Sequence, residues 1–206
     1  MSENKYVYHG SHIPDLKVIK PHKSTHLQNW VYATSSKAVA TIFLSNKHSD
    51  LYYYLGGNDE DNNLVLVERK KGMFKDIFDV SGSIYKLSSK NFINGITGWS
   101  MEVVSNREEQ VLEEEQIKNV YEELIKFNDE GKIKLYLYPN RPSYIPLDNS
   151  DLIPKVIRWS KKGLKIGNFF ELYPELTDRF YEELEKTTDD ELILLLVTTG
   201  SHSKIF

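Results

Sequence analysis

The chain has 206 residues, of which 40% are hydrophobic and 12% aromatic, enough for a packed core and unlike the composition of a disordered chain. Its formal net charge of −4 offers no general attraction to nucleic acid or to an anionic membrane. The absence of cysteine excludes disulfides, thiol catalysis and zinc–thiolate sites. No stretch approaches about 18 apolar residues and the N-terminus lacks an apolar signal region, so the sequence predicts a soluble, cytoplasmic protein.

The first predicted strand covers residues 6–9, which are aromatic or β-branched up to a histidine. Gly10 follows and is predicted to mark the end of this strand. A histidine on the last residue of a strand lies at the rim of a sheet, where a ligand can reach it. Gly10 carries no Cβ, so its backbone can approach that ligand closely.

A second strand is predicted over residues 30–34, after a polar loop at 22–29. The hydroxyl residues 34–36 are good N-caps for a helix over roughly 36–47, whose apolar residues fall on one face. Tyr32 is therefore expected near a strand end, as His9 is.

The chain then alternates between glycine-rich loops and short strands. Loops are predicted at residues 56–63 and 94–98, and strands at 64–68, 83–87, 99–105 and around 110–112. The segment 73–78 between two of these strands has no clear pattern. This part of the chain, with one helix among many short strands, predicts an α+β domain.

The pattern becomes mostly helical after residue 117. A helix with apolar residues at 117, 120, 121, 124 and 125, closed by Gly131, and a strand at 133–137 precede a linker at 139–146 with three prolines. Three further helices are predicted, one starting near residue 150, one after Pro174 and one over 192–197. We place a boundary at about 140–147, which gives a domain over 1–140 and a small C-terminal helical module over 147–206.

Three short motifs resemble the signatures of NAD-dependent ADP-ribosyltransferases with a His–Tyr–Glu (H-Y-E) triad, the branch of diphtheria-type toxins and poly(ADP-ribose) polymerases. They are residues 8–11 (Tyr-His-Gly-Ser), 32–34 (Tyr-Ala-Thr) and 102–104 (Glu-Val-Val). In that branch the histidine ends the first strand, the tyrosine ends a second strand just before a helix, and the glutamate opens a later strand. Gln110 and Val111 also resemble the Gln-Val that follows the polymerase glutamate. The resemblance covers about residues 5–115 and implies a split β-sheet core with few helices.

The resemblance also implies a role for each matched residue. Glu102, His9 and Tyr32 would be the catalytic triad, and His9, Gly10, Ser11, Tyr32, Ser36 and Phe43 would bind NAD. Glu102 would bind the nicotinamide-ribose 2′-hydroxyl, His9 the adenosine-side ribose and Gly10 the carboxamide. Tyr32 offers a flat face on which the nicotinamide ring can stack.

The chemistry of NAD cleavage fits these residue types independently. Breaking the bond between nicotinamide and ribose creates positive charge on the ribose, and a nearby carboxylate stabilises that charge where it develops. Glu102 is the candidate, and none of the chemistry requires a metal. His22 and His26 are four residues apart, but their polar surroundings and Pro21 predict a loop rather than a metal-binding helix.

Two departures from the family pattern concern the nicotinamide. Where many polymerases have a serine that holds the carboxamide, this chain has Ala38, and Ser35 or Ser36 would have to substitute. The second stacking tyrosine has no clear equivalent; Thr41 is nearest in line and Phe43 is the alternative.

The sequence predicts an enzyme that transfers ADP-ribose from NAD to an unidentified acceptor, protein or nucleic acid. A NAD glycohydrolase, with water as acceptor, and a catalytically inactive module of the same fold that binds a nucleotide or a protein stay open. RNA 2′-phosphotransferases share the fold but use arginines beside the histidine, and this chain has none before Arg69. An inhibitor or antitoxin partner also stays open, as does an unrelated α+β domain in which the three motifs coincide by chance.

Two clusters of basic residues are predicted to be solvated faces rather than phosphate-binding tracks. One contains Arg69, Lys70, Lys71 and Lys75, and the other Arg158, Lys161, Lys162 and Lys165. The aromatic residues of the C-terminal helices are predicted to form a packed core, with recognition of the target as the alternative.

Overall fold

The computed structural model describes residues 5–23, 28–58 and 64–187, and the chain divides into two compact units, Met1–Asn140 and Arg141–Phe206. Unit 1 combines several antiparallel sheets with few helices, which confirms the predicted α+β class. Among the helices of the described segments, none has the length and apolar character that crossing a membrane requires.

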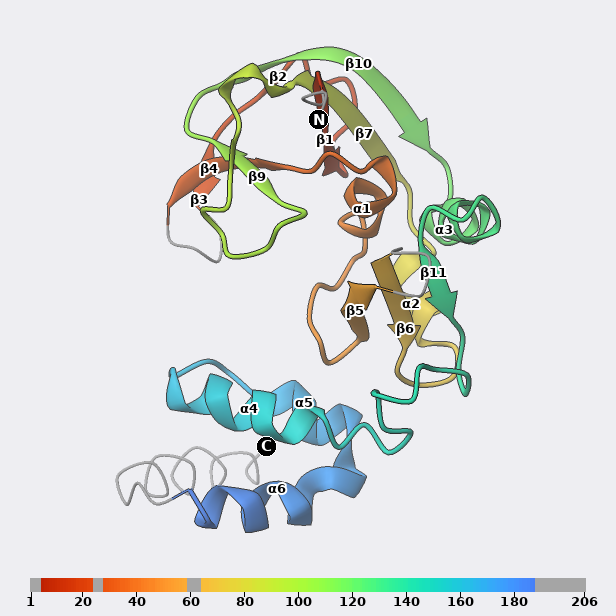
Figure 1. Cartoon of the computed structure of the whole chain (residues 1–206), viewed down its shortest axis with the longest axis vertical. Coiled ribbons are helices and arrows are strands. Elements are labelled where there is room, and N and C mark those ends of the chain that lie inside the picture. Colours follow the sequence, from red (N-terminus) through yellow and green to blue (C-terminus); the bar gives the residue numbers. More distant parts are fainter. Residues whose placement is uncertain (1–4, 24–27, 59–63, 188–206) are drawn as a thin grey trace, which may run out of the picture. The chain divides into compact units, whose positions relative to one another are not determined.

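The first sheet of unit 1 contains four antiparallel strands in the order β1-β7-β10-β2 (Figure 1). Their bounds are Tyr6–Ser11 (β1), Gly82–Ser88 (β7), Glu109–Ile117 (β10) and Val18–Ile19 (β2). The β1–β7 ladder extends from Tyr6 opposite Ser88 to Ser11 opposite Ser83. The prediction that His9 ends the first strand is therefore wrong, because the pairing with β7 carries β1 two residues further.

The second sheet has the order β3-β4-β9-β8. Its strands are His22–Lys23 (β3), Asn29–Ala33 (β4), Val103–Ser105 (β9) and Ile93–Asn94 (β8). His22 pairs with Trp30 and Lys23 with Asn29, so the residues predicted as one polar loop begin with an edge strand. Strand β9 is shorter than predicted, because residues 99–101 form a turn that precedes Glu102.

A third sheet, β11-β6-β5, completes unit 1 together with two helices. Its strands are Lys134–Tyr136 (β11), Leu64–Glu68 (β6) and Tyr53–Asn58 (β5), and the helices are Met73–Phe78 (α2) and Val120–Asp129 (α3). All five residues of β6 are buried, four of them apolar, and the buried Glu68 accepts a hydrogen bond from the Phe74 backbone N–H at 3.0 Å. Gly56 and Gly57, predicted as a turn, belong to β5, where a register shift next to Gly56 accommodates them.

One bridge joins the first two sheets at β1 and β4. The Tyr8 backbone N–H donates to Thr34 O at 2.7 Å, and the Thr34 N–H donates to Tyr8 O at 3.0 Å. Strands β7, β1, β4 and β9 are therefore consecutive neighbours, although they come from distant parts of the chain.

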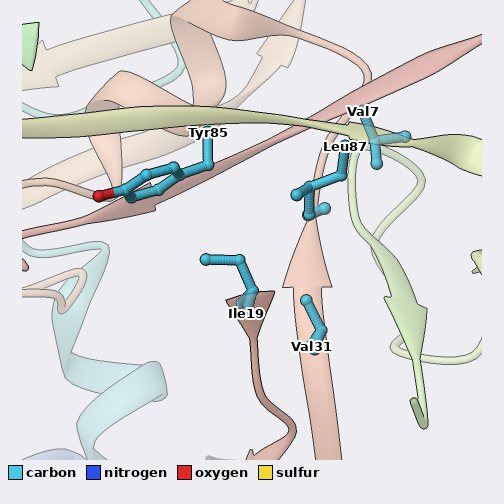
Figure 2. Close-up of a cluster of buried hydrophobic side chains, with 6 residues drawn as sticks. Val7, Ile19, Val31, Tyr85 and Leu87 are labelled. Atoms are coloured by element: carbon cyan, nitrogen blue, oxygen red, sulfur yellow. The ribbon is translucent and has the colours of Figure 1, made fainter. Parts of the chain in front are cut away.

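A buried apolar cluster holds these strands together. Figure 2 shows Val7, Ile19, Val31, Tyr85 and Leu87 directed towards one another, and Ala33 belongs to the same cluster. Its members come from β1, β2, β4 and β7, so the cluster spans the bridge between the two sheets. The hydrophobic effect therefore fixes β4 against β1 even though only one bridge connects the two strands.

Helix α1 (Lys37–Ile42) packs on the side of β1 that carries Gly10. A Cβ placed on Gly10 would lie 2.6 Å from Ala40 O, and one on Gly82 would lie 2.8 Å from a Leu44 methyl carbon. Both glycines therefore make room for the helix and for the residue that follows its end. The helix begins after Ser36 as predicted but ends at Ile42, well before residue 47.

Unit 2 consists of helices around a buried aromatic core. The elements are Leu152–Lys161 (α4), Gly167–Leu172 (α5), the 3-10 turn Pro174–Leu176 (η2) and Thr177–Glu185 (α6). Phe169, Tyr173 and Phe180 are fully buried, and the rings of Phe169 and Phe180 lie 5.7 Å apart. This supports the predicted aromatic core, whereas the helix predicted over 192–197 lies outside the described residues.

Candidate functional site

His9 lies on β1 next to the point where β1 and β4 separate. Its Nδ1 donates to the backbone carbonyl of Tyr32 at 2.7 Å, because a carbonyl oxygen can only accept. Burial lowers the pKa of His9 below 6.5, the hydrogen bond to Tyr32 raises it by less, and His22 lowers it further. At neutral pH the imidazole is therefore uncharged, with its proton on Nδ1 and the lone pair of Nε2 directed away from this bond.

The β1–β4 ladder stops after its single bridge, and the His9 side chain occupies the position where it would continue. In an antiparallel ladder, alternate residues direct their backbone groups to the same neighbour. Since Tyr8 bonds Thr34, the N–H and C=O of Gly10 are directed towards β4 as well. The Tyr32 carbonyl that Gly10 would meet there accepts from His9 instead. Backbone polar groups of β1 thus border an interruption in the sheet.

Tyr32 lies in a group of three rings on one face of β3 and β4. Its ring centroid is 6.0 Å from that of Trp30 and 6.2 Å from that of His22. Trp30 precedes it by two positions on β4, and His22 pairs with Trp30 across β3. The half-buried Tyr32 therefore presents an aromatic surface that extends from the interruption to an edge strand.

Glu102 immediately precedes β9, the strand that pairs with β4 on the side away from β1. Ala33 is opposite Val103, so extending this register by one residue places Glu102 opposite Thr34. The Glu102 backbone N–H donates to Trp99 O at 3.1 Å and closes the preceding turn. Within the described parts of the chain, its half-buried carboxylate has no hydrogen bond or ion pair.

Two of the predicted triad residues thus lie on adjacent strands and Glu102 directly precedes the next strand, but the three are not all on one face. Directly opposed residues of an antiparallel pair share a face, and successive residues alternate. Because Tyr8 is opposite Thr34, Tyr32 and Glu102 share the face of Tyr8, whereas His9 leaves β1 on the other face. His9 joins Tyr32 through the backbone carbonyl at the interruption rather than ring to ring.

The other predicted NAD-binding residues have structural roles. Ser36 Oγ accepts from Val39 N–H at 3.3 Å as the N-cap of α1, and Ser11 Oγ accepts from Ile13 N–H at 3.1 Å in a turn. Gly10 makes room for α1, and Ala38 is buried. Phe43 follows α1, and its ring contacts those of Trp99 at 5.8 Å and His48 at 6.0 Å.

Trp99 and His22 are next to predicted site residues but were not predicted with them. Trp99 connects the turn before Glu102 to the end of α1 through Phe43. Its position three residues before Glu102 in a glycine-rich loop was the only sequence signal. His22 was assigned to a loop, and pairing with Trp30 is what brings it to Tyr32.

Two further observations bear on ligands. A hollow of about 600 Å³ is lined by His12, Asp79, Val80, Ser81 and Lys118, and none of the three predicted triad residues lines it. Within residues 5–23, 28–58 and 64–187, no three His, Asp or Glu side chains come together as a metal site. His26, which is four residues after His22 in the sequence, lies outside these ranges.

Comparison of the chain with protein-family models, with curated proteins and with solved structures gave no match. The geometry of β1, β4 and β9 and the chemistry of their side chains are therefore the basis on which a function can be proposed.

Proposed function

We propose that the protein cleaves the nicotinamide–ribose bond of NAD and transfers the ADP-ribose to an acceptor. The observation that carries this proposal is that β1, β4 and β9 are adjacent, with His9 on β1, Tyr32 on β4 and Glu102 directly before β9, although His9 projects from the opposite face to the other two. The three residues are separated by 23 and 70 residues in sequence, yet β4 is bonded to both β1 and β9. This order supports the split-sheet ADP-ribosyltransferase fold that the motifs resemble.

Glu102 is the residue that would stabilise the developing charge on the ribose. Its carboxylate is half-buried and has no protein cation beside it within the described residues, so its charge is not already neutralised. A negative charge in a partly desolvated position acts more strongly on a nearby oxocarbenium centre than one in water. Because it has no partner in the described residues, the Glu102 carboxylate can also accept a hydrogen bond from a ribose hydroxyl or from the incoming acceptor.

His9 and Tyr32 would position the dinucleotide. With Nδ1 committed to the Tyr32 carbonyl, Nε2 of the neutral imidazole can accept a hydrogen bond from a ribose hydroxyl. Tyr32 shares the face of Glu102 and offers its ring for stacking on nicotinamide. The backbone groups of Gly10 border the same interruption and can pair with a carboxamide.

A catalytically inactive module of this fold is the second candidate, and one observation favours it. The serine nearest to the expected carboxamide-binding position, Ser36, already uses its oxygen as the cap of α1. Ala38 is buried and has no hydroxyl. Such a module would bind a nucleotide at the interruption and would release no nicotinamide.

The deciding experiment measures free nicotinamide after the full chain is incubated with NAD, for the wild type and for Glu102→Gln. We expect the wild type to release nicotinamide and Glu102→Gln to lose about 10²–10³-fold in rate, the size of effect seen when one transition-state partner is removed. Glu108→Gln is the matched control, since this exposed glutamate pairs with Lys20 and lies outside the site.

The alternatives give different results in the same experiment. No release by the wild type, combined with NAD binding, identifies the inactive module. Release with equal rates in both variants contradicts the role of Glu102. Mass spectrometry of added protein, DNA and RNA separates transfer from glycohydrolysis, in which water is the only acceptor.

A further inference from the structure

Unit 2 separates its charges along the sequence. Residues 152–165 contain Lys155, Arg158, Lys161, Lys162 and Lys165 and no acidic residue. Residues 171–185 contain Glu171, Glu175, Asp178, Glu182, Glu183 and Glu185 against a single Arg179. The first stretch forms α4 and the turn after it, and the second includes α6. Residues 152–165 are thus strongly basic although the chain as a whole has a net charge of −4.

The cations of α4 lie opposite its buried face. The buried residues are Leu152, Ile153, Val156, Ile157 and Ser160, a continuous stripe at helical spacing. Arg158, Lys161, Lys162 and Lys165 are all exposed, and we call these four residues the basic end of α4. Half-buried Trp159 and exposed Leu164 lie among them. The basic end is a solvent-facing surface, with an aromatic and an aliphatic side chain between its cations.

Three of these cations have no partner in the described parts of the chain. No ion pair or hydrogen bond involves the side chains of Arg158, Lys162 or Lys165. Some other lysines pair with nearby acids, as Lys37 does with Glu115 and Lys86 with Glu113, whereas Lys71, Lys75 and Lys118 of the described part of unit 1 are unpaired as well. The helix dipole favours cations in the last turn of α4, but Lys165 lies beyond that turn. Helix stability therefore does not account for the whole cluster.

We propose that the basic end of α4 binds the phosphodiester backbone of a nucleic acid. Each phosphate that is neutralised releases condensed counterions, so a few exposed cations suffice for measurable affinity at low salt. Trp159 and Leu164 add apolar surface for bases or sugars between the cations. The net charge of −4 does not prevent this, because salt screens acids that lie beyond the Debye length, which is about 14 Å at 50 mM and about 8 Å at physiological ionic strength.

An acidic protein surface is a weaker candidate than a nucleic acid as the ligand of the basic end of α4. The same holds for α6 of a second copy of the chain. An exposed ion pair contributes only about 0–1 kcal/mol, so three or four of them do not hold two proteins together without a larger apolar contact. The charge density of a nucleic acid strand removes that requirement. The inference is independent of NAD cleavage and extends the sequence analysis, which predicted a merely solvated face here.

The test is fluorescence anisotropy of labelled 20-nucleotide single-stranded RNA, single-stranded DNA and duplex DNA, titrated with the full chain at several KCl concentrations. The triple variant Arg158→Gln, Lys162→Gln and Lys165→Gln keeps side chains that favour helix and removes three charges. We expect it to lose about tenfold or more in affinity at 50 mM KCl, with a salt slope smaller by about two. Nicotinamide release with water as acceptor stays unchanged in this variant.

The control variant removes three exposed lysines of unit 1, Lys71→Gln, Lys75→Gln and Lys118→Gln. It has the same net charge as the first variant and is expected to lose less than about threefold in affinity. Equal losses in both variants, or no binding of any probe by the wild type at 50 mM KCl, overturn the proposal. So does a salt-sensitive dimer, seen by sedimentation, that only the first variant abolishes.

Discussion

The two sides of strand β1 differ sharply in how they are bonded. Towards β7, the ladder runs through every residue of the strand, from Tyr6 to Ser11. Towards β4, it has one bridge, at Tyr8 and Thr34, followed by the His9 side chain on the Tyr32 carbonyl. We call the fully paired boundary between β1 and β7 the closed seam, and the interrupted boundary between β1 and β4 the open seam. Backbone groups and an uncharged imidazole are available to a ligand only at the open seam.

Burial follows the same division. Tyr85 and Leu87 of the closed seam are fully buried, whereas His9 and Tyr32 at the open seam are partly exposed, as is Glu102 on the far side of β4. A closed seam gains free energy of folding from apolar burial, and an open seam leaves polar groups free to bind. The predictions below test whether stability and proposed function separate along this division.

The largest change in stability is expected from Leu87→Ala at the closed seam. Leu87 is fully buried in the cluster of Figure 2, so the truncation leaves a cavity and lowers the free energy of unfolding by about 3 kcal/mol. Urea denaturation measures this directly. Leu112→Ala, on neighbouring β10 with a side chain 55% exposed, is the control and should change stability by less than about 0.5 kcal/mol. Similar losses in both variants would contradict the closed-seam core.

Gly10→Ala distinguishes two roles for the glycine between the seams. The new Cβ would lie 2.6 Å from the Ala40 carbonyl oxygen, so α1 has to shift, and we expect a loss of about 2 kcal/mol in urea denaturation. Gly167→Ala, where a Cβ meets nothing, is the control and should leave stability unchanged or slightly raised. If Gly10→Ala is as stable as the wild type and only NAD binding weakens, the glycine serves the ligand rather than the helix.

Ser36→Ala tests the segment that follows β4 at the open seam. Loss of the cap on Val39 N–H should cost about 1 kcal/mol of stability. The control is Ser35→Ala, since this neighbouring serine is exposed and is not the cap of α1. A serine that only caps the helix leaves the KM for NAD unchanged. A raised KM in Ser36→Ala but not in Ser35→Ala would instead assign it to the nicotinamide carboxamide.

Elements held by their own apolar pattern could be predicted from the sequence, and those held by distant partners could not. Strands β6 and β7 are clear in the sequence because each contains a short run with several apolar residues that are buried, Leu64–Val67 in β6 and Ile84, Tyr85 and Leu87 in β7. Strand β10 was predicted only around 110–112, because Glu113, Glu114 and Glu115 disfavour a strand by themselves. The Lys86–Glu113 ion pair and the Ser83–Glu114 hydrogen bond across to β7 compensate for this. Helix α2 could not be predicted from a capping residue, because Gly72 at its N-terminus has no side chain to cap it.

The same distinction applies to the candidate site. Motif order predicted His9, Tyr32 and Glu102 at strand ends; Tyr32 lies next to the end of β4 and Glu102 next to the start of β9, whereas β1 continues two residues past His9. The bond from His9 to the Tyr32 carbonyl, and the face that each side chain takes, depend on one bridge between Tyr8 and Thr34. Periodicity contains no information about such a bridge. Gly10 was predicted from the sequence to let the backbone approach a ligand, and only the position of Ala40 in the structure shows that it also makes room for α1.

The smallest expected change concerns pH and the open seam. Burial is the main reason why the pKa of His9 lies below 6.5, so the unfolded chain binds a proton at this residue before the folded chain does. Its contribution to stability is therefore complete above about pH 6.5 and decreases as the pH falls below that value. Burial also lowers the pKa of His48, so this residue makes stability decrease with falling pH in the same way. It is present in both the wild type and the His9 variant, so its contribution is the same in the two proteins. We expect His9→Asn to unfold with a shallower pH dependence than the wild type between about pH 7 and pH 5. Identical slopes in urea denaturation across that range would show that the pKa of His9 is the same in the folded and the unfolded chain, and would contradict the burial of its imidazole at the open seam.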